Sequence, residues 1–333
     1  MKRHLLLFAI LLSSAVSCGK SSDSGEKPDP AGDKTAMGKD RPIRMVPPGK
    51  KKQVLEPSNN ATSPAIPSDL DELVTLLGQP SAIPSRTLND TIKGYGRQAI
   101  PRLLKALTDS GNHVRLAAVK LLGDMKEYAR EIAPHLIAQL DKEPVMQIRS
   151  MTIDALARLE LFSEEVQAAF LKSLSDAGWL VRWEAVRGLG SFGEKAKGFA
   201  PHLEKKLEDV NNWVQLYAAI SLLKILGKSE KASKHLILLT LDADVRFRTN
   251  VVAQIESLPP ATCPDTAAAL LKLVADPDVK VRRVASRALA TCAPELTSSP
   301  AVEEPLKKAE QDPDHSVKSN ATKALGLLKP AVK

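Results

Sequence analysis

The sequence predicts an all-α fold, an α-solenoid built from antiparallel helix pairs. One pattern recurs as VRLAAVKLLG at 114–123, VRWEAVRGLG at 181–190 and VRRVASRALA at 281–290. Looser copies bring the spacing to 31–36 residues, which accommodates two short helices and two turns. A second amphipathic run precedes each copy, as in AIPRLLKALTD and TAAALLKLVAD. Because a catalytic motif is normally written once, we interpret the repetition as architecture.

Residues 1–18 have the pattern of an export signal. Lys2 and Arg3 precede an apolar run at 5–12, and small residues lead to Cys18. The tripeptide before Cys18 resembles the lipobox of bacterial lipoproteins. That resemblance implies cleavage before Cys18 and a diacylglyceryl thioether on its sulfur, hence a membrane-anchored protein of the bacterial cell envelope facing the periplasm or exterior. A plain secretory signal with a coincidental cysteine is the alternative.

Residues 19–66 are predicted to form a disordered tether, because Pro, Lys, Asp, Ser and Gly dominate and no apolar period is present. A flexible coil of this length spans roughly 40 Å. The signal and the tether hold two and three of the eight excess positive charges, which leaves +3 for residues 67–333. Such a balanced surface argues against a nucleic-acid partner, which requires a concentrated basic face.

Residues 67–330 are predicted to form the solenoid, with seven repeats at 98–327 after a degenerate helix pair at 69–96. The second position of the pattern serves as a marker, and it is occupied by Arg115, Arg149, Arg182, Gln215, Arg246, Arg282 and Lys318. An acidic residue stands six positions earlier in every repeat but the fifth: Asp109, Glu143, Asp176, Asp209, Asp276 and Asp312. In the fifth repeat Thr240 holds that position, with Asp242 and Asp244 nearby. We expect each carboxylate to cap a helix or to bind an arginine of its own or the next repeat.

The repeated pattern resembles the HEAT repeat family, in the short version found in phycobilisome lyase-like proteins, whose second helix reads V-R-x-x-A-A-x-A-L-G. First-helix prolines agree with the resemblance: Pro101, Pro134, Pro201 and Pro305. The resemblance implies a superhelix whose second helices line the concave side. It implies no reaction.

No sequence motif supports catalysis. GLGSFG at 188–193 matches a dinucleotide fingerprint in spacing but follows a helix instead of a strand. We expect Gly190, like Gly123 and Gly326, to end a helix in a left-handed conformation. No His-Glu dipeptide occurs, so the chain lacks the signature of the HEAT-repeat hydroxylases. We therefore predict no enzyme activity, cofactor or metal.

Aromatic residues concentrate between 162 and 247. In repeats three to five the concave positions turn apolar, and the predicted partner-binding strip comprises Trp183, Leu216, Tyr217, Ile220, Phe247 and Val251. Exposed apolar strips usually mark binding, although the same residues could instead fill the core. The leading hypothesis is a monomeric, lipid-anchored, non-catalytic scaffold that binds a protein or peptide. The alternatives are an enzyme-associated lyase or chaperone and a purely structural envelope spacer.

Two cysteines remain once Cys18 is lipidated. Cys263 opens the first helix of repeat six, and Cys292 follows the end of its second helix, so antiparallel pairing places both at one edge. An oxidising compartment favours a disulfide between them. Two small buried thiols are the alternative, because helix axes lie about 8–10 Å apart and a disulfide needs Cα atoms within about 7 Å.

Overall fold

The computed structural model describes residues 66–79 and 83–330. Within them lie sixteen α-helices and no β-strand, apart from one isolated bridge between Thr297 and Lys329. The prediction of an all-α solenoid is confirmed. The predicted signal, Cys18 and the tether up to residue 65 lie outside the described residues. No described helix is long and apolar enough to cross a bilayer.

The helices form eight consecutive pairs, α1–α2 to α15–α16. The first pair is α1 (Leu70–Thr75) and α2 (Ser85–Gly94). The odd-numbered helices of the seven repeats are α3 (Ile100–Ala106), α5 (Ala129–Lys142), α7 (Glu164–Ser173), α9 (Ala200–Lys206), α11 (Glu230–Leu239), α13 (Cys263–Leu273) and α15 (Pro300–Ala309). The even-numbered helices are α4 (Asn112–Gly123), α6 (Met146–Arg158), α8 (Trp179–Ser191), α10 (Asn212–Leu226), α12 (Val245–Glu256), α14 (Val279–Cys292) and α16 (His315–Leu327).

Short 3₁₀ turns lead into five of the odd-numbered helices: η1 (Gly96–Ala99), η2 (Lys126–Tyr128), η3 (Gly193–Phe199), η4 (Pro260–Thr262) and η5 (Ala293–Glu295).

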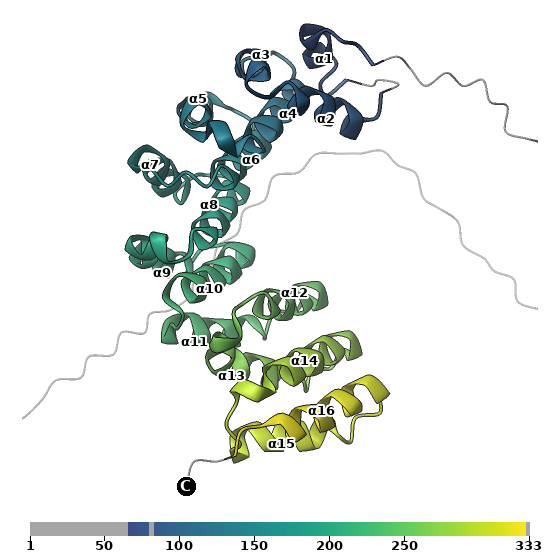
Figure 1. The fold of residues 1–333 in the computed structure, drawn as a ribbon. Helices are drawn as coiled ribbons and strands as arrows, with labels where there is room; N and C mark the ends of the chain where they lie inside the picture. Colours follow the sequence, from purple (N-terminus) through teal and green to yellow (C-terminus); the bar gives the residue numbers. More distant parts are fainter. Residues whose placement is uncertain (1–65, 80–82, 331–333) are drawn as a thin grey trace, which may run out of the picture. The chain divides into compact units, whose positions relative to one another are not determined.

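Two rows of helices make up residues 66–330. Each even-numbered helix packs against its odd-numbered partner, and from α4 to α16 successive even-numbered helices pack against one another (Figure 1). Pairs that are distant along the chain do not pack together, as expected of a solenoid. Within the seven repeats, neighbouring even-numbered helices approach each other closely, except α10 and α12, which share few contacts.

The core runs as one continuous hydrophobic cluster between the rows. The position three residues after the marker is fully buried and small in most repeats, as at Ala118, Ala185, Ala285 and Ala321. Small side chains there let neighbouring helices approach, and branched residues such as Leu103 and Leu136 fill the remaining space.

Local chemistry explains where the even-numbered helices begin. The side chains of Asn211, Asp244, Asp278 and Asp314 each accept a hydrogen bond from a backbone N–H in the first turn. Those amides have no partner inside the helix, so a short polar side chain at this position stabilises the start.

The predicted role of three glycines is wrong. Gly123, Gly190 and Gly326 lie inside helices with negative φ, and the left-handed glycines near α8 and α10 are Gly193 and Gly227. Gly123 and Gly190 instead allow close packing of successive even-numbered helices. A Cβ on Gly123 would lie 2.6 Å from Cβ of Ala155 in α6. A Cβ on Gly326, in the last repeat, would meet nothing within 4 Å.

Candidate functional site

A ladder of buried ion pairs links successive repeats. Arg182 in α8 shows the pattern: its Nη1 donates to the carbonyls of Asp176 and Ala177 in its own turn, at 2.9 and 3.0 Å. Its Nε and Nη2 donate to both carboxylate oxygens of Asp209 in the next repeat, at 2.8 and 2.7 Å. The Arg182 guanidinium therefore links the turn between the two helices of its own repeat to the equivalent turn of the next repeat.

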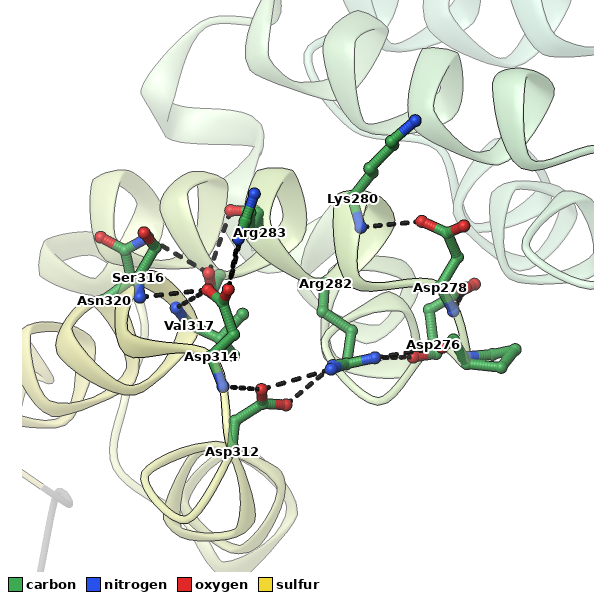
Figure 2. A network of polar contacts seen from close by, with 12 residues as sticks. Asp276, Asp278, Lys280, Arg282, Arg283, Asp312, Asp314, Ser316, Val317 and Asn320 are labelled. Atoms are coloured by element: carbon green, nitrogen blue, oxygen red, sulfur yellow. Dashed lines mark hydrogen bonds and ion pairs between the residues drawn. The ribbon is translucent and has the colours of Figure 1, made fainter. Parts of the chain in front are cut away.

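The same arrangement occurs at five junctions, which we name the arginine ladder. Its pairs, with the Nε to carboxylate distance, are Arg115–Glu143 (2.8 Å), Arg149–Asp176 (2.9 Å), Arg182–Asp209 (2.8 Å), Arg248–Asp276 (2.6 Å) and Arg282–Asp312 (2.7 Å). Figure 2 shows Arg282 lying between Asp276 and Asp312. Each carboxylate also accepts the backbone N–H two residues ahead, as Asp312 does from Asp314 at 2.8 Å. Asp109, the first acid of the series, makes only this second kind of contact: its carboxylate accepts the backbone N–H of Gly111.

In the fifth repeat the marker lies two residues later than the sequence pattern predicted. Arg248, not Arg246, occupies the marker position, because it donates to the carbonyls of Asp242 and Ala243 and pairs with Asp276. Arg246 is exposed, and the acid six positions before the marker is Asp242, not Thr240. The corrected spacings around this repeat are 33 and 34 residues. The recurrent Asp-x-Asp of DADV, DPDV and DPDH was the signal for this register, and the dipeptide Val-Arg at 245–246 concealed it.

The ladder has one gap, between the fourth and fifth repeats. Gln215 stands at the marker and donates only to the Asp209 carbonyl, while its Oε1 lies 3.1 Å from His235 Nε2. Asp242 receives a hydrogen bond from Asn212 instead of an arginine. This gap coincides with the sparse packing of α10 on α12.

Four ladder carboxylates have a lowered pKa. Burial pushes the pKa of Asp209 upward, and the hydrogen bonds from Arg182 and the Asn211 amide outweigh it, so the pKa lies below its ordinary value. The pKa values of Glu143, Asp176 and Asp312 are lowered in the same way. A carboxylate whose oxygens are both bonded to the arginine of the preceding repeat stabilises the fold and is a poor candidate for proton transfer.

The predicted partner-binding strip is mostly buried, so its prediction as an exposed surface is wrong. Leu216 and Val251 are 0% exposed, and Ile220 and Phe247 are 1% exposed. The two-residue shift explains the last repeat: Phe247 directly precedes the true marker and Val251 follows it by three, and both positions face the core. Leu216 and Ile220 are buried because the apolar residues of α10 extend beyond a single helix face, and neighbouring helices cover these two positions.

Trp183 and Tyr217 are the two members of the strip that remain half-exposed. Their rings meet edge to face, with centroids 5.1 Å apart, and the Arg187 guanidinium lies 5.8 Å from the Trp183 centroid. Arg187 Nε donates to Glu184 Oε1 at 2.8 Å, and its Nη2 donates to Asp154 of α6. We define the Trp183 cluster as Asp154, Trp183, Glu184, Arg187, Tyr217 and Lys224.

The Trp183 cluster holds ionisable groups with displaced pKa values. Burial raises the pKa of Glu184 despite its bonds to Arg187, and burial raises the pKa of Tyr217. Lys224 is exposed to solvent, yet the surrounding protein and the positive charge of Arg187 lower its pKa. Trp183 Nε1 is the one buried side-chain polar atom in the described part of the chain without a hydrogen-bond partner. Grouped displaced pKa values and an unmet donor are typical of functional sites.

The sequence predicted only part of this cluster. The spacing of Glu184 and Arg187 along one helix was a detectable signal. Their contact with Asp154 depends on how α6 and α8 pack, which the sequence does not show.

Cys263 and Cys292 form a disulfide with Cα atoms 5.4 Å apart, which resolves the alternative that the sequence left open.

Comparisons with known proteins agree with the geometry. A HEAT-repeat family model matches residues 133–224 and 267–332. The chain contains HEAT repeats. The unmatched segment between these two ranges holds α11 and α12, next to the ladder gap.

Solved HEAT-like structures resemble the chain at low sequence identity. The Escherichia coli protein YibA is 14% identical with a TM-score of 0.54, and the match covers 77% of this chain and 92% of YibA. The CpcE–CpcF complex of phycocyanin lyase from Nostoc sp. PCC7120 is 17% identical, with a TM-score of 0.44 and coverage of 82% and 99%. Human deoxyhypusine hydroxylase is 19% identical, with a TM-score of 0.33 and coverage of 78% and 95%. These likenesses concern the fold alone. None of the curated proteins matches the sequence.

Proposed function

We propose that the chain is a non-catalytic scaffold that binds a protein or peptide partner through the Trp183 cluster. The observation that carries the proposal is the combination of a half-exposed Trp–Tyr pair with an unmet Trp183 N–H and with Lys224, which has no carboxylate within ion-pair distance among the described residues. Tryptophan, tyrosine and arginine dominate the energetics of protein interfaces. A partner carboxylate would supply the counter-ion that the exposed Lys224 ammonium lacks, while the Trp183 and Tyr217 rings offer the apolar contact.

Binding explains the cluster better than catalysis does. Glu184 has the raised pKa of a general acid, but its bonds go to Arg187, and the cluster as defined contains no Ser, Cys or His. HEAT repeats present the side chains of their even-numbered helices along an extended row, which suits the recognition of a polypeptide.

The proposal is tested by comparing two double variants of the full chain. Trp183→Ala with Lys224→Glu alters the cluster. Leu116→Ala with Lys120→Glu makes similar changes on α4, one and five residues after its marker. Quantitative mass spectrometry of proteins retained from envelope membranes should show partners lost about tenfold or more with the first variant only. Identical recovery with both variants, at unchanged helicity, would overturn the proposal.

We further propose that a lipid on Cys18 anchors this scaffold in a bacterial envelope membrane. Support comes from the lipobox-like residues before Cys18. Cys18→Ala is expected to remove metabolic lipid labelling and to shift the protein from the membrane to the soluble fraction. Unlabelled wild-type protein in the soluble fraction would contradict the anchor without affecting the partner-binding test.

A further inference from the structure

A groove on the odd-numbered side of the repeats has an apolar floor. It is a hollow of about 1090 Å³ between α5 and the start of α7. Its floor consists of Ala133, Pro134 and Ile137 from α5 with Leu161 and Phe162 from the loop before α7. Ile137, Leu161 and Phe162 are each half-buried, so the floor is open to an occupant.

The floor is held by aromatic packing. The Phe162 ring lies 4.4 Å from that of Phe192 and 6.0 Å from that of Phe199, and Phe192 also meets Phe170 edge to face. Glu160, directly before this loop, has φ 55° and is the one non-glycine residue with positive φ in the described ranges. A left-handed residue costs about 1 kcal/mol or more. The loop that carries Leu161 and Phe162 is therefore held in one backbone conformation by the packing around it.

The rim of the groove carries cations without counter-ions. Of the arginines in residues 66–79 and 83–330, only Arg130 and Arg246 have no carboxylate within 4.0 Å, and Arg130 lies on this rim. Lys195 of η3, also on the rim, has no ion-pair partner in the described part of the chain. In a chain that pairs nearly all its arginines, an unpaired arginine beside an apolar hollow points to an anionic occupant.

The groove is longer than one side chain. A second hollow of about 480 Å³ shares Arg130 and Leu161 with the first and continues past Tyr128 to Lys126 and Glu160. The rim also carries Glu165, whose pKa is lowered by the Ser163 hydroxyl. A rim with both signs of charge disfavours a fatty acid, which offers no donor to Glu165, and suits a peptide, which has both N–H donors and carboxylates.

We propose that this groove binds an extended acidic segment of a partner polypeptide. The segment places an aliphatic or aromatic side chain on Phe162 and Ile137, and a neighbouring Asp or Glu between Arg130 and Lys195. This site is separate from the Trp183 cluster and does not depend on the function proposed there.

The test is selection from a random nonapeptide display library on the purified full-length chain. Selected peptides should carry Asp or Glu beside Phe, Leu or Ile. Arg130→Glu with Lys195→Glu should weaken their binding about tenfold or more. The matched control is Arg246→Glu with Lys228→Glu, which reverses another unpaired arginine and an exposed lysine far along the chain and should leave binding unchanged. The Trp183→Ala with Lys224→Glu variant should also retain the peptides.

Three outcomes would overturn the proposal. They are the absence of any enriched peptide, enriched peptides without acidic residues, and equal binding by the Arg130/Lys195 variant and the control. Saturable binding of laurate that requires Arg130, without peptide enrichment, would assign the groove to an anionic lipid instead.

Discussion

Single atoms decide how closely neighbouring repeats pack. The hydrogen side chain of Gly123 faces Ala155, and that of Gly190 faces Ser221 of the next even-numbered helix. A methyl group at Gly123 would meet not only Ala155 Cβ but also its Cα, at 2.8 Å, so the backbone itself must move. Glycine is retained there in spite of its low helix propensity because the interface leaves no room.

Gly123→Ala should destabilise the protein by roughly 1–3 kcal/mol, the usual cost of overpacking. Gly326→Ala is the matched control, since it occupies the equivalent position in the last repeat with free space around it. This control should be neutral or more stable by up to about 1 kcal/mol, from helix propensity alone. Urea unfolding of both variants measures the difference. Equal destabilisation would contradict the packing role.

The disulfide acts at the same scale by joining the two helices of the sixth repeat. Reduction of Cys263–Cys292 should lower stability by roughly 3.5 kcal/mol in the chain-entropy model for a loop of this length. Thermal unfolding with and without reductant measures it. A variant with both cysteines changed to serine serves as control and should no longer respond to reductant. A wild-type melting temperature that is insensitive to reductant, with two thiols alkylated after unfolding, would mean that no bridge forms.

At the scale of the element, five of the six junctions between the even-numbered helices of the seven repeats combine close packing with one arginine link. The junction of α10 and α12 lacks both, since Gln215 replaces the arginine and the helices share few contacts. Gln215 and Asp242 are 27 residues apart, the same separation as in the pairs Arg149–Asp176 and Arg182–Asp209. The sequence spacing for a sixth link is therefore present without its cation.

Gln215→Arg should complete the ladder and raise the melting temperature by roughly 2–4 °C, equivalent to about 1 kcal/mol in a protein of this size. Gln215→Lys is the control, because an ammonium cannot form the two parallel bonds of a guanidinium and should gain less. The gain should disappear when Asp242→Asn is added. A melting temperature that falls with Gln215→Arg would show that the gap is favoured by packing around His235.

At the scale of the whole solenoid, the ladder distributes one kind of charge pair over five junctions. Because each helix pair packs only on its neighbours, stability is close to a sum of repeat and interface contributions. Four ladder acids share one response to pH: Glu143, Asp176, Asp209 and Asp312. Their pKa values are lowered in the folded state, so they add stability above the unfolded values of 3.8 for Asp and 4.5 for Glu. That stability is lost as pH falls through the folded values.

The melting temperature should accordingly be nearly constant just above about pH 5 and fall steeply below about pH 4. Arg182→Gln, which copies the residue at the gap, leaves Asp209 buried without its cation. It should cost roughly 3 kcal/mol at neutral pH. This deficit should shrink as the pH falls below about 4, because Asp209 without its arginine loses the lowered pKa that made its contribution depend on pH. Calorimetric scans across the pH range measure both effects. An unchanged acid limb in Arg182→Gln would mean that the ladder does not govern acid unfolding.

Much of this architecture is readable in the sequence because it repeats. A period near 33 residues, an apolar stripe at helical spacing and an acid six residues before an arginine predict the helix pairs and the residues of the ladder. The sequence left open whether each acid binds the arginine of its own repeat or of a neighbour. The structure places Asp209 on Arg182 of the preceding repeat, because the turns of successive repeats lie side by side only after stacking.

Only the tertiary structure decided which faces remain open. Helical spacing identifies the side on which Leu216, Ile220 or Gly190 lies, but what covers that side depends on the neighbouring helix. Leu216 and Ile220 are covered by neighbouring helices although Tyr217 and Lys224 of the same helix stay open, and Gly190 serves packing because Ser221 lies against it. The Trp183 cluster and the groove between α5 and α7 each combine residues from three or more elements. The residues of each site become neighbours only when the repeats stack. Periodicity is a local property of one chain segment, whereas exposure belongs to the contacts between segments.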